Sequence, residues 1–203
     1  MPAWAVSVAG LGWCLKKMSD RLGQRTVPMM GIASAFIFAA QMVNFPVLGG
    51  TSGHLLGGVL AAVLLGPFAG AMVLTCVLFV QCLVFQDGGL IALGANVVNM
   101  AFVGSMGGYL IYRLIAAKGG RSSRTVLMIG VAVASWLSVV LAAVACSLEL
   151  ALSGTSPLRV VLPAMVGVHA VIGLGEAVIT SLVIGFLIKV RPDVIYRPGR
   201  DDR

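Results

Sequence analysis

Charged residues are scarce in this 203-residue chain: Lys, Arg, Asp and Glu together make up only 10% of it, whereas 59% is apolar. The charges cluster in short runs between long uncharged stretches. A soluble globular domain has a much smaller apolar share, and a membrane-spanning helix needs about 20 predominantly apolar residues. We therefore predict an all-α, polytopic membrane protein surrounded by the lipid bilayer.

Motifs that would give the chain an activity of its own are also missing. There is no GxxxxGK[ST] sequence for a P-loop, and the HExxH, CxxC and paired DxD motifs are absent. The four cysteines lie in apolar stretches, where we interpret them as packing residues. The excess of Lys and Arg, which gives a net charge of +7, is typical of cytoplasmic loops, so we exclude nucleic acid as a partner. Without a P-loop, a membrane protein with this sequence could drive active transport only with energy from partner subunits or from an ion gradient.

The longest uncharged stretch, from Thr26 up to Asp87, is too long for one crossing. The polar, glycine-rich segment Asn44–Gly53 divides it, and Gly66-Pro67 offers a second break because proline ends or kinks a helix. If the chain turns at Gly66-Pro67 it crosses seven times, and thirteen of its fourteen basic residues fall on one side, Arg159 being the exception. Without that turn the basic clusters fall on both sides. The positive-inside rule favours the seven-crossing model.

This model places the amino terminus outside and the carboxyl terminus in the cytoplasm. Residues 1–188 form a single transmembrane domain, and residues 189–203 form a basic cytoplasmic tail. The segment 44–53, the turn 86–89 and the loop 151–163 are external. Two segments look short: 55–65, and the first apolar stretch, whose fifteen residues reach only about 22 Å against a hydrocarbon core of about 30 Å. The first stretch also lacks the basic region and cleavage site of a signal peptide.

The chain has only two histidines, and one of them, His54, ends the glycine-rich segment. Imidazole is the commonest protein ligand for transition metals. A histidine held by bent backbone inside a membrane protein is a candidate ligand on a transport route. A lone histidine is more often a structural group, but the polar neighbours and flexible backbone around His54 favour a metal ligand.

Further polar residues gather on the predicted external side. Asn96 and Asn99 are three residues apart and share a helix face, and His169 and Glu176 share another. Each has a structural explanation as well: Asp87 can form an Asp-Gly turn, and Glu176 can be protonated or can tie two helices together. The residues predicted to support the site are Asn44, Ser52, Asp87, Asn96, Asn99, His169 and Glu176.

Four segments in order carry a family resemblance: QMVNFPV at 41–47, GGTSGHLLGG at 49–58, FQDGGLIALGAN at 85–96 and HAVIGLGEAVIT at 169–180. From about Pro2 to about Ile188 the chain resembles the CbiM/NikM family. These proteins are the substrate-specific membrane components (S components) of energy-coupling-factor (ECF) ABC transporters for cobalt and nickel. The resemblance implies a seven-helix fold in a prokaryotic cell membrane, and uptake of Co(II) or Ni(II) as cargo, with no permanently bound cofactor. It also implies a link to cobalamin biosynthesis.

The resemblance implies partners and a metal site too. The partners are a transmembrane coupling subunit, ABC ATPase subunits and, in many systems, a small auxiliary membrane subunit. In the family a Met-His amino terminus supplies three nitrogen ligands, and the histidine of GTSGH, here His54, supplies the fourth; a planar nitrogen set suits Ni(II). This chain instead begins Met1-Pro2-Ala3-Trp4, and Pro2 has no amide proton. We expect a mis-assigned start or a truncated chain, and poor metal binding by the chain as written.

Two alternatives remain beside a metal-binding transport component. The first is a degenerate scaffold subunit that binds no metal, which the Met-Pro start supports. The second is a membrane-embedded enzyme using His169 and Glu176, but no nucleophile–base arrangement accompanies them.

Cysteine-accessibility labelling tests the predicted topology. In a chain whose four cysteines are replaced, a cysteine at Ser122 should resist a membrane-impermeant reagent added from outside, because its basic loop is predicted to be cytoplasmic. A cysteine at Ser153, in the predicted external loop, should react. Labelling of Ser122→Cys from outside would contradict the seven-crossing model.

Overall fold

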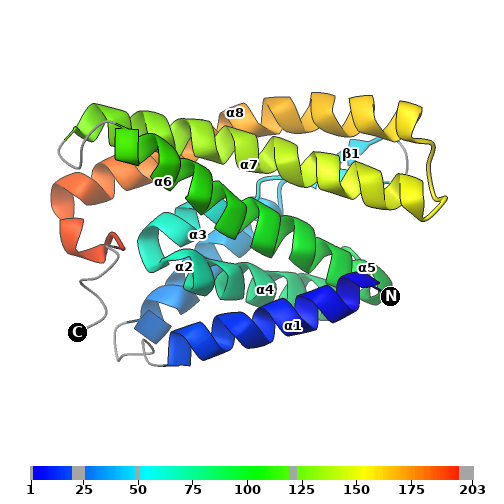
Figure 1. The fold of residues 1–203 in the computed structure, drawn as a ribbon, viewed down its shortest axis with the longest axis horizontal. Coiled ribbons are helices and arrows are strands. Elements are labelled where there is room, and N and C mark those ends of the chain that lie inside the picture. Colours follow the sequence, from blue (N-terminus) through cyan, green and yellow to red (C-terminus); the bar gives the residue numbers. More distant parts are fainter. Residues whose placement is uncertain (1, 20–25, 49–50, 119–122, 197–203) are drawn as a thin grey trace.

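The computed structural model describes residues 2–19, 26–48, 51–118 and 123–196, which form a helical bundle with one small β-hairpin (Figure 1). The first half of the chain contains α1 (Pro2–Met18), α2 (Thr26–Gln41), strands β1 (Asn44–Val47) and β2 (Thr51–His54), α3 (Gly58–Leu65) and α4 (Pro67–Val84). The second half contains α5 (Leu90–Asn96), the π-helical η2 (Val97–Gly107), α6 (Gly108–Lys118), α7 (Arg124–Leu152), α8 (Leu158–Val190) and the 3-10 turn η3 (Pro192–Val194).

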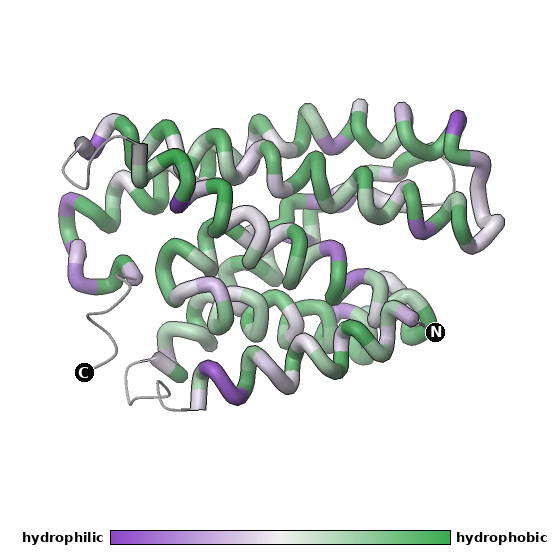
Figure 2. Tube along the Cα trace, viewed as in Figure 1, coloured by the Kyte–Doolittle hydropathy of each residue, from purple (hydrophilic) through white to green (hydrophobic). Residues whose placement is uncertain are grey.

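Four helical segments of the described chain are long and apolar enough to cross a membrane: 67–84, 90–117, 124–152 and 158–190. The second of them joins α5, η2 and α6 into one continuous span. Hydrophobic residues run along these helices, and hydrophilic residues gather mainly towards their ends and loops (Figure 2). The prediction of an all-α, multi-pass membrane protein is confirmed. Seven crossings and the side that each terminus faces stay predictions.

The two segments predicted to be short differ from each other. Helix α1 continues through Lys16 and Lys17 to Met18, so its 17 residues reach about 26 Å. Helix α3 has only eight residues, about 12 Å, and its residues 58–63 are all buried. It is therefore a short internal helix, and the described residues before it, 44–48 and 51–57, are not helical. Non-helical backbone is tolerated at membrane depth only where protein surrounds it or where it lines a cavity.

The chain reverses direction at Gly66-Pro67, as the seven-crossing model requires. Gly66 has φ 88° and ψ 161°, a conformation that glycine adopts readily and other residues rarely do. Pro67 opens α4 at a position where its missing N–H is not needed. The two helices then pack closely, because a Cβ at Gly70 would come within 2.9 Å of the Cα of Ala62.

The described basic residues gather mainly at one end of the bundle. The ends of α1, α6 and α8 and the start of α7 lie there, whereas α5 and the α7–α8 connection lie at the other end (Figure 1). The α3–α4 turn belongs to the first end, because the backbone N–H of Tyr196, just after α8, donates to the carbonyl of Val63 at 3.1 Å. The rest of the predicted cytoplasmic clusters, including Ser122, lies outside the described residues.

The close packing of α3 can be tested at Gly58. A Cβ there would lie 2.8 Å from the backbone carbonyl carbon of Gly104 in η2, and backbone atoms cannot rotate away as a side chain would. We expect Gly58→Ala to destabilise the protein by about 1–3 kcal/mol, the usual range for overpacking. Thermal unfolding in detergent micelles measures this.

Gly175→Ala in α8 is the matched control, because nothing lies within 4 Å of a Cβ built there. It should leave stability unchanged or raise it by up to about 1 kcal/mol through helix propensity. Equal stability of the two variants would contradict the tight contact between α3 and η2.

Candidate functional site

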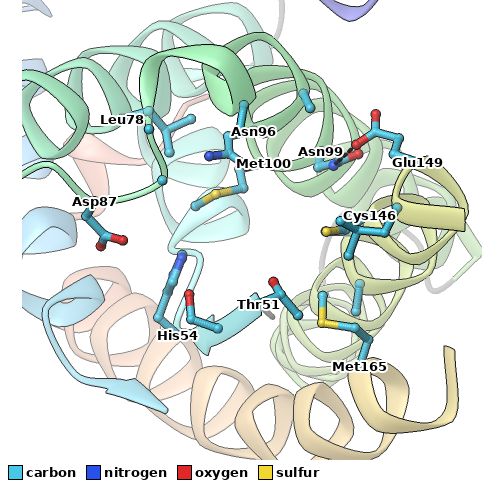
Figure 3. Close-up of a pocket in the computed structure, with 18 of the residues that line it drawn as sticks. Thr51, His54, Leu78, Asp87, Asn96, Asn99, Met100, Cys146, Glu149 and Met165 are labelled. Atoms are coloured by element: carbon cyan, nitrogen blue, oxygen red, sulfur yellow. Dashed lines mark hydrogen bonds between the residues drawn. The ribbon is translucent and has the colours of Figure 1, made fainter. Parts of the chain in front are cut away.

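A cavity of about 830 Å³ opens between the hairpin, the α5–η2 span, α7 and α8. Figure 3 shows its polar and sulfur-containing side chains lying around a common space. Six of the eight residues predicted for the site line this cavity, although they come from four separate parts of the chain: Ser52, His54, Asp87, Asn96, Asn99 and His169. The fold therefore brings most of the predicted site together.

The glycine-rich segment forms a β-hairpin that sequence reasoning did not predict. Strands β1 and β2 are antiparallel, with Asn44 opposite His54 and Pro46 opposite Ser52. A proline is compatible with this sheet because both of its strands are edges. Helix α8 lies directly on β2, since a Cβ at Gly53 would meet Ile172 at 2.8 Å and His169 at 3.1 Å. The hairpin thereby presents Ser52 and His54 at the cavity.

The imidazole of His54 is half-buried, and its Nδ1 lies 2.8 Å from the carbonyl oxygen of Leu55. A carbonyl oxygen can only accept a hydrogen bond, so Nδ1 carries the proton of the neutral ring. The Nε2 atom then keeps its lone pair. A metal-ligating histidine has this arrangement, with one nitrogen free for the ion and the other held by a hydrogen bond.

His169 has the same tautomer but a more buried position. Its Nδ1 lies 2.8 Å from the carbonyl oxygen of Met165, one turn earlier in α8. The ring also packs against the backbone of Gly53. His169 thus packs against β2 and lines the cavity at the same time; its supporting role at a metal site stays a prediction.

Asn96 and Asn99 both line the cavity, as their shared helix face predicted. Asn99 lies in η2, and π-helical segments are uncommon and occur often at functional sites. The side-chain amide of Asn99 donates to Oε2 of Glu149 in α7 at 2.7 Å. The Oδ1 atom of Asn99 is buried and has no hydrogen-bond partner among the described residues. This pair closes the α7 side of the cavity (Figure 3).

Two of the predicted residues do not line the cavity. Asn44 is exposed at the start of β1. Glu176 is only 2% exposed, and its carboxylate accepts the backbone N–H groups of Leu56 and Gly57 at 2.5 and 2.9 Å. Glu176 therefore links α8 to the backbone of the segment that follows His54. The alternative that it ties two helices together is not what the structure shows.

Several cavity residues were missed by sequence reasoning or were assigned to packing. Cys146 and Met165 do pack, with Val161 and Ala143, but they also face the cavity (Figure 3). Glu149 lies near the end of α7 with no motif around it. The i, i+3 spacing of Cys146 and Glu149 was the only available signal, because it places them on one helix face.

The described residues do not complete a metal site on their own, since they contain no group of three or more His, Cys, Asp and Glu side chains that could hold an ion. What they supply at the cavity is one oriented imidazole, together with amide, hydroxyl, carboxylate and sulfur atoms. A transition-metal ion bound here with high affinity needs further donors close to His54.

Comparison with known proteins gives a consistent result along the chain. The family model for the cobalt uptake substrate-specific transmembrane region, CbiM, matches residues 1–194. A putative fused nickel transport protein of Archaeoglobus fulgidus is 44% identical over 97% of this chain. A putative metal transport protein of Haloquadratum walsbyi is 36% identical over 95% of this chain and 86% of its own length.

A solved structure shares the fold as well. The crystal structure of a transition metal transporter matches with a TM-score of 0.85 at 39% identity, over 93% of this chain and 87% of that chain. The chain spans 65% of the A. fulgidus protein, less than two thirds of its length.

The cavity predicts different reactivities for two of the cysteines. Cys146 is half-buried and lines the cavity, whereas Cys14 in α1 is fully buried. In detergent, with Cys76 and Cys82 replaced by alanine, a small water-soluble thiosulfonate reagent should modify Cys146 faster than Cys14, because access limits the reaction. Mass spectrometry of the peptides measures both rates. Equal rates would show that water does not reach the cavity wall.

Proposed function

The chain belongs to the CbiM family, whose members are membrane components of metal transport and not enzymes, and on this premise we propose that it binds Co(II) or Ni(II) from the external side for import. The observation that carries the proposal is the cavity, where an imidazole with a free nitrogen lies among polar side chains. The ion is cargo, so the site must release it as well as bind it. The membrane-embedded enzyme that used His169 and Glu176 is not supported by this family.

We propose His54 as a direct metal ligand through Nε2. Its tautomer leaves this atom available, and α8 supports the strand that carries it. Imidazole nitrogen suits both Ni(II) and Co(II). The names of the relatives support a transition metal, but they include both nickel and cobalt, so the cargo is proposed as the class that the two ions share.

The other donors are proposed to come from a Met-His opening placed ahead of Pro2. The start of α1 lies beside α5, because a Cβ at Gly94 would come within 3.0 Å of the backbone of Trp4. Neighbouring α5 residues Ala92, Ala95 and Asn96 line the cavity. A segment leaving α1 at this point therefore starts beside a helix that lines the cavity.

Energy for import is proposed to come from ECF partners: a transmembrane coupling subunit and ABC ATPase subunits, with a small auxiliary membrane subunit. The sequence has no P-loop of its own. The same proposal includes delivery of the imported metal to cobalamin biosynthesis. It also includes a single transmembrane domain at residues 1–188 and a basic cytoplasmic tail at residues 189–203. The non-binding scaffold is the second candidate, since the described residues alone form no complete metal site.

Isothermal titration with Ni(II) and Co(II) separates these candidates. The chain as written should bind weakly, and the same chain with a Met-His opening ahead of Pro2 should bind by orders of magnitude more tightly. The reason is that each lost direct ligand should cost more than the roughly 10–100-fold typical of an outer-shell partner. In the extended chain, His54→Ala should remove most of that gain.

Asn44→Ala is the matched control, because Asn44 faces His54 across the hairpin but does not line the cavity. It should bind metal as the extended parent does. Equal affinity of the extended parent and its His54→Ala variant would rule out His54 as a ligand. Failure of the extended parent to bind either ion would favour the scaffold.

A further inference from the structure

A single peptide group connects His54 to Glu176, a buried residue of α8 that does not line the cavity. The carbonyl oxygen of the Leu55–Leu56 peptide accepts the Nδ1 proton of His54 at 2.8 Å. The N–H of the same peptide donates to Oε2 of Glu176 at 2.5 Å. We propose that Glu176 is a positioning residue for His54, which holds the imidazole with Nε2 directed to the metal; this inference rests on the proposed function.

The next peptide group is held in the same way. The N–H of the Leu56–Gly57 peptide donates to Oε1 of Glu176 at 2.9 Å, and its carbonyl oxygen accepts from Nε2 of Gln41 at 2.7 Å. Gln41 accepts in turn from the side chain of Gln81 in α4 at 2.9 Å. Both peptide groups are therefore fixed on both sides, and neither can rotate without losing two hydrogen bonds.

The carboxylate of Glu176 lies at the N-terminus of α3, because the N–H groups that it accepts belong to Leu56 and Gly57, the two residues directly before this helix. Its N-cap residue is Gly57, with φ 74° and no side chain to accept the free N–H groups. Free N–H groups and the helix dipole favour an anion at a helix N-terminus. Glu176, more than a hundred residues later, places its carboxylate there by accepting the N–H of the N-cap residue Gly57 and that of Leu56 before it. In glutamine an NH2 donor replaces one of the two carboxylate oxygens, so one of the two N–H groups would face a donor in place of its acceptor.

Glu176 affects the imidazole of His54 in two ways: it fixes the position of the peptide group between them, and it polarises that peptide group. A hydrogen bond from the peptide N–H to a carboxylate strengthens the carbonyl of the same peptide as an acceptor, because hydrogen-bond chains are cooperative. That carbonyl holds the Nδ1 proton of His54 and so selects the tautomer that leaves Nε2 free. Metal-bound histidines are commonly oriented by a carboxylate or a carbonyl on the second nitrogen. Here a carbonyl makes that contact and Glu176 acts behind it.

The first test needs no metal. The protein has only two histidines, so ¹⁵N-histidine labelling gives few NMR signals, which a His169→Gln variant assigns. Metal-free parent should show His54 protonated at Nδ1, and Glu176→Gln should shift it towards the Nε2-protonated tautomer. Hydrogen exchange at the amides of Leu56 and Gly57 should become faster in the same variant.

The second test measures metal directly, in the chain that carries the Met-His opening. Glu176→Gln should lower Ni(II) affinity by about 10–100-fold, the range typical of residues that orient a ligand, and should move the ligand-field absorption bands. Glu176→Asp keeps both acceptors one methylene further away, so its affinity should lie between those of parent and Gln variant. The Asp variant also serves if the Gln variant does not fold.

Trp136→Phe is the matched control. It removes a hydrogen bond from α7 to the carbonyl of Ala170 in α8 that does not involve the Leu55–Gly57 segment. Thermal stability should fall, while the His54 tautomer and the absorption bands stay as in the parent. An unchanged tautomer and unchanged bands in both Glu176 variants would overturn the positioning role. If the parent binds no metal, the proposed function fails, and the tautomer and exchange data still decide whether Glu176 holds His54.

Discussion

The need to satisfy every backbone polar group inside a membrane protein governs the architecture around His54. The described residues between Gln41 and Gly58 leave helical geometry, and those of their N–H and C=O groups that are buried need partners within the protein. The hairpin pairs some of these groups with one another. Glu176 and Gln41 take those that follow the hairpin. Each unsatisfied buried group would cost roughly 1–3 kcal/mol, so these distant partners stabilise the segment.

The same constraint explains why α3 is short and why the cavity lies where it does. The hairpin and the Leu55–Gly57 linker occupy the residues before α3, so this helix begins only at Gly58. The part of this segment that borders the cavity is a hairpin and not a helix. The space is bounded instead by Asn96 and Asn99 from one span and by Cys146 from another. The cavity thus lies between the hairpin and its longer helical neighbours.

Local features of the sequence predicted local features of the structure. The breaks at Gly66-Pro67 and after Gln41 were visible because proline, glycine and polar residues interrupt apolar runs. The common face of Asn96 and Asn99 followed from helical spacing. The hairpin was not predicted, because its strands are only four residues long and carry no alternation. The π-helical register of η2 also leaves no recognisable pattern in the residues 97–107.

Contacts between distant segments could not be read from spacing at all. Glu176 was a candidate because a carboxylate within an apolar helix is costly, but no pattern linked it to Leu56, 120 residues earlier. Glu149 and Cys146 were hidden for the same reason: their importance depends on Asn99 and the hairpin lying opposite them. The seven-crossing count and the cytoplasmic clusters depend on loops such as 119–122, which lie outside the described residues.

The identity of residue 176 follows from the geometry it has to serve. Two successive N–H groups just before α3, those of Leu56 and Gly57, are accepted by one side chain, and among uncharged residues none offers two acceptor oxygens without also presenting a donor. A carboxylate does, but it brings a negative charge into the protein interior, where charges interact strongly. That charge lies one peptide group away from the imidazole proposed to bind a divalent cation. The carboxylate that completes the backbone hydrogen bonding is therefore also placed to favour the cation proposed at His54.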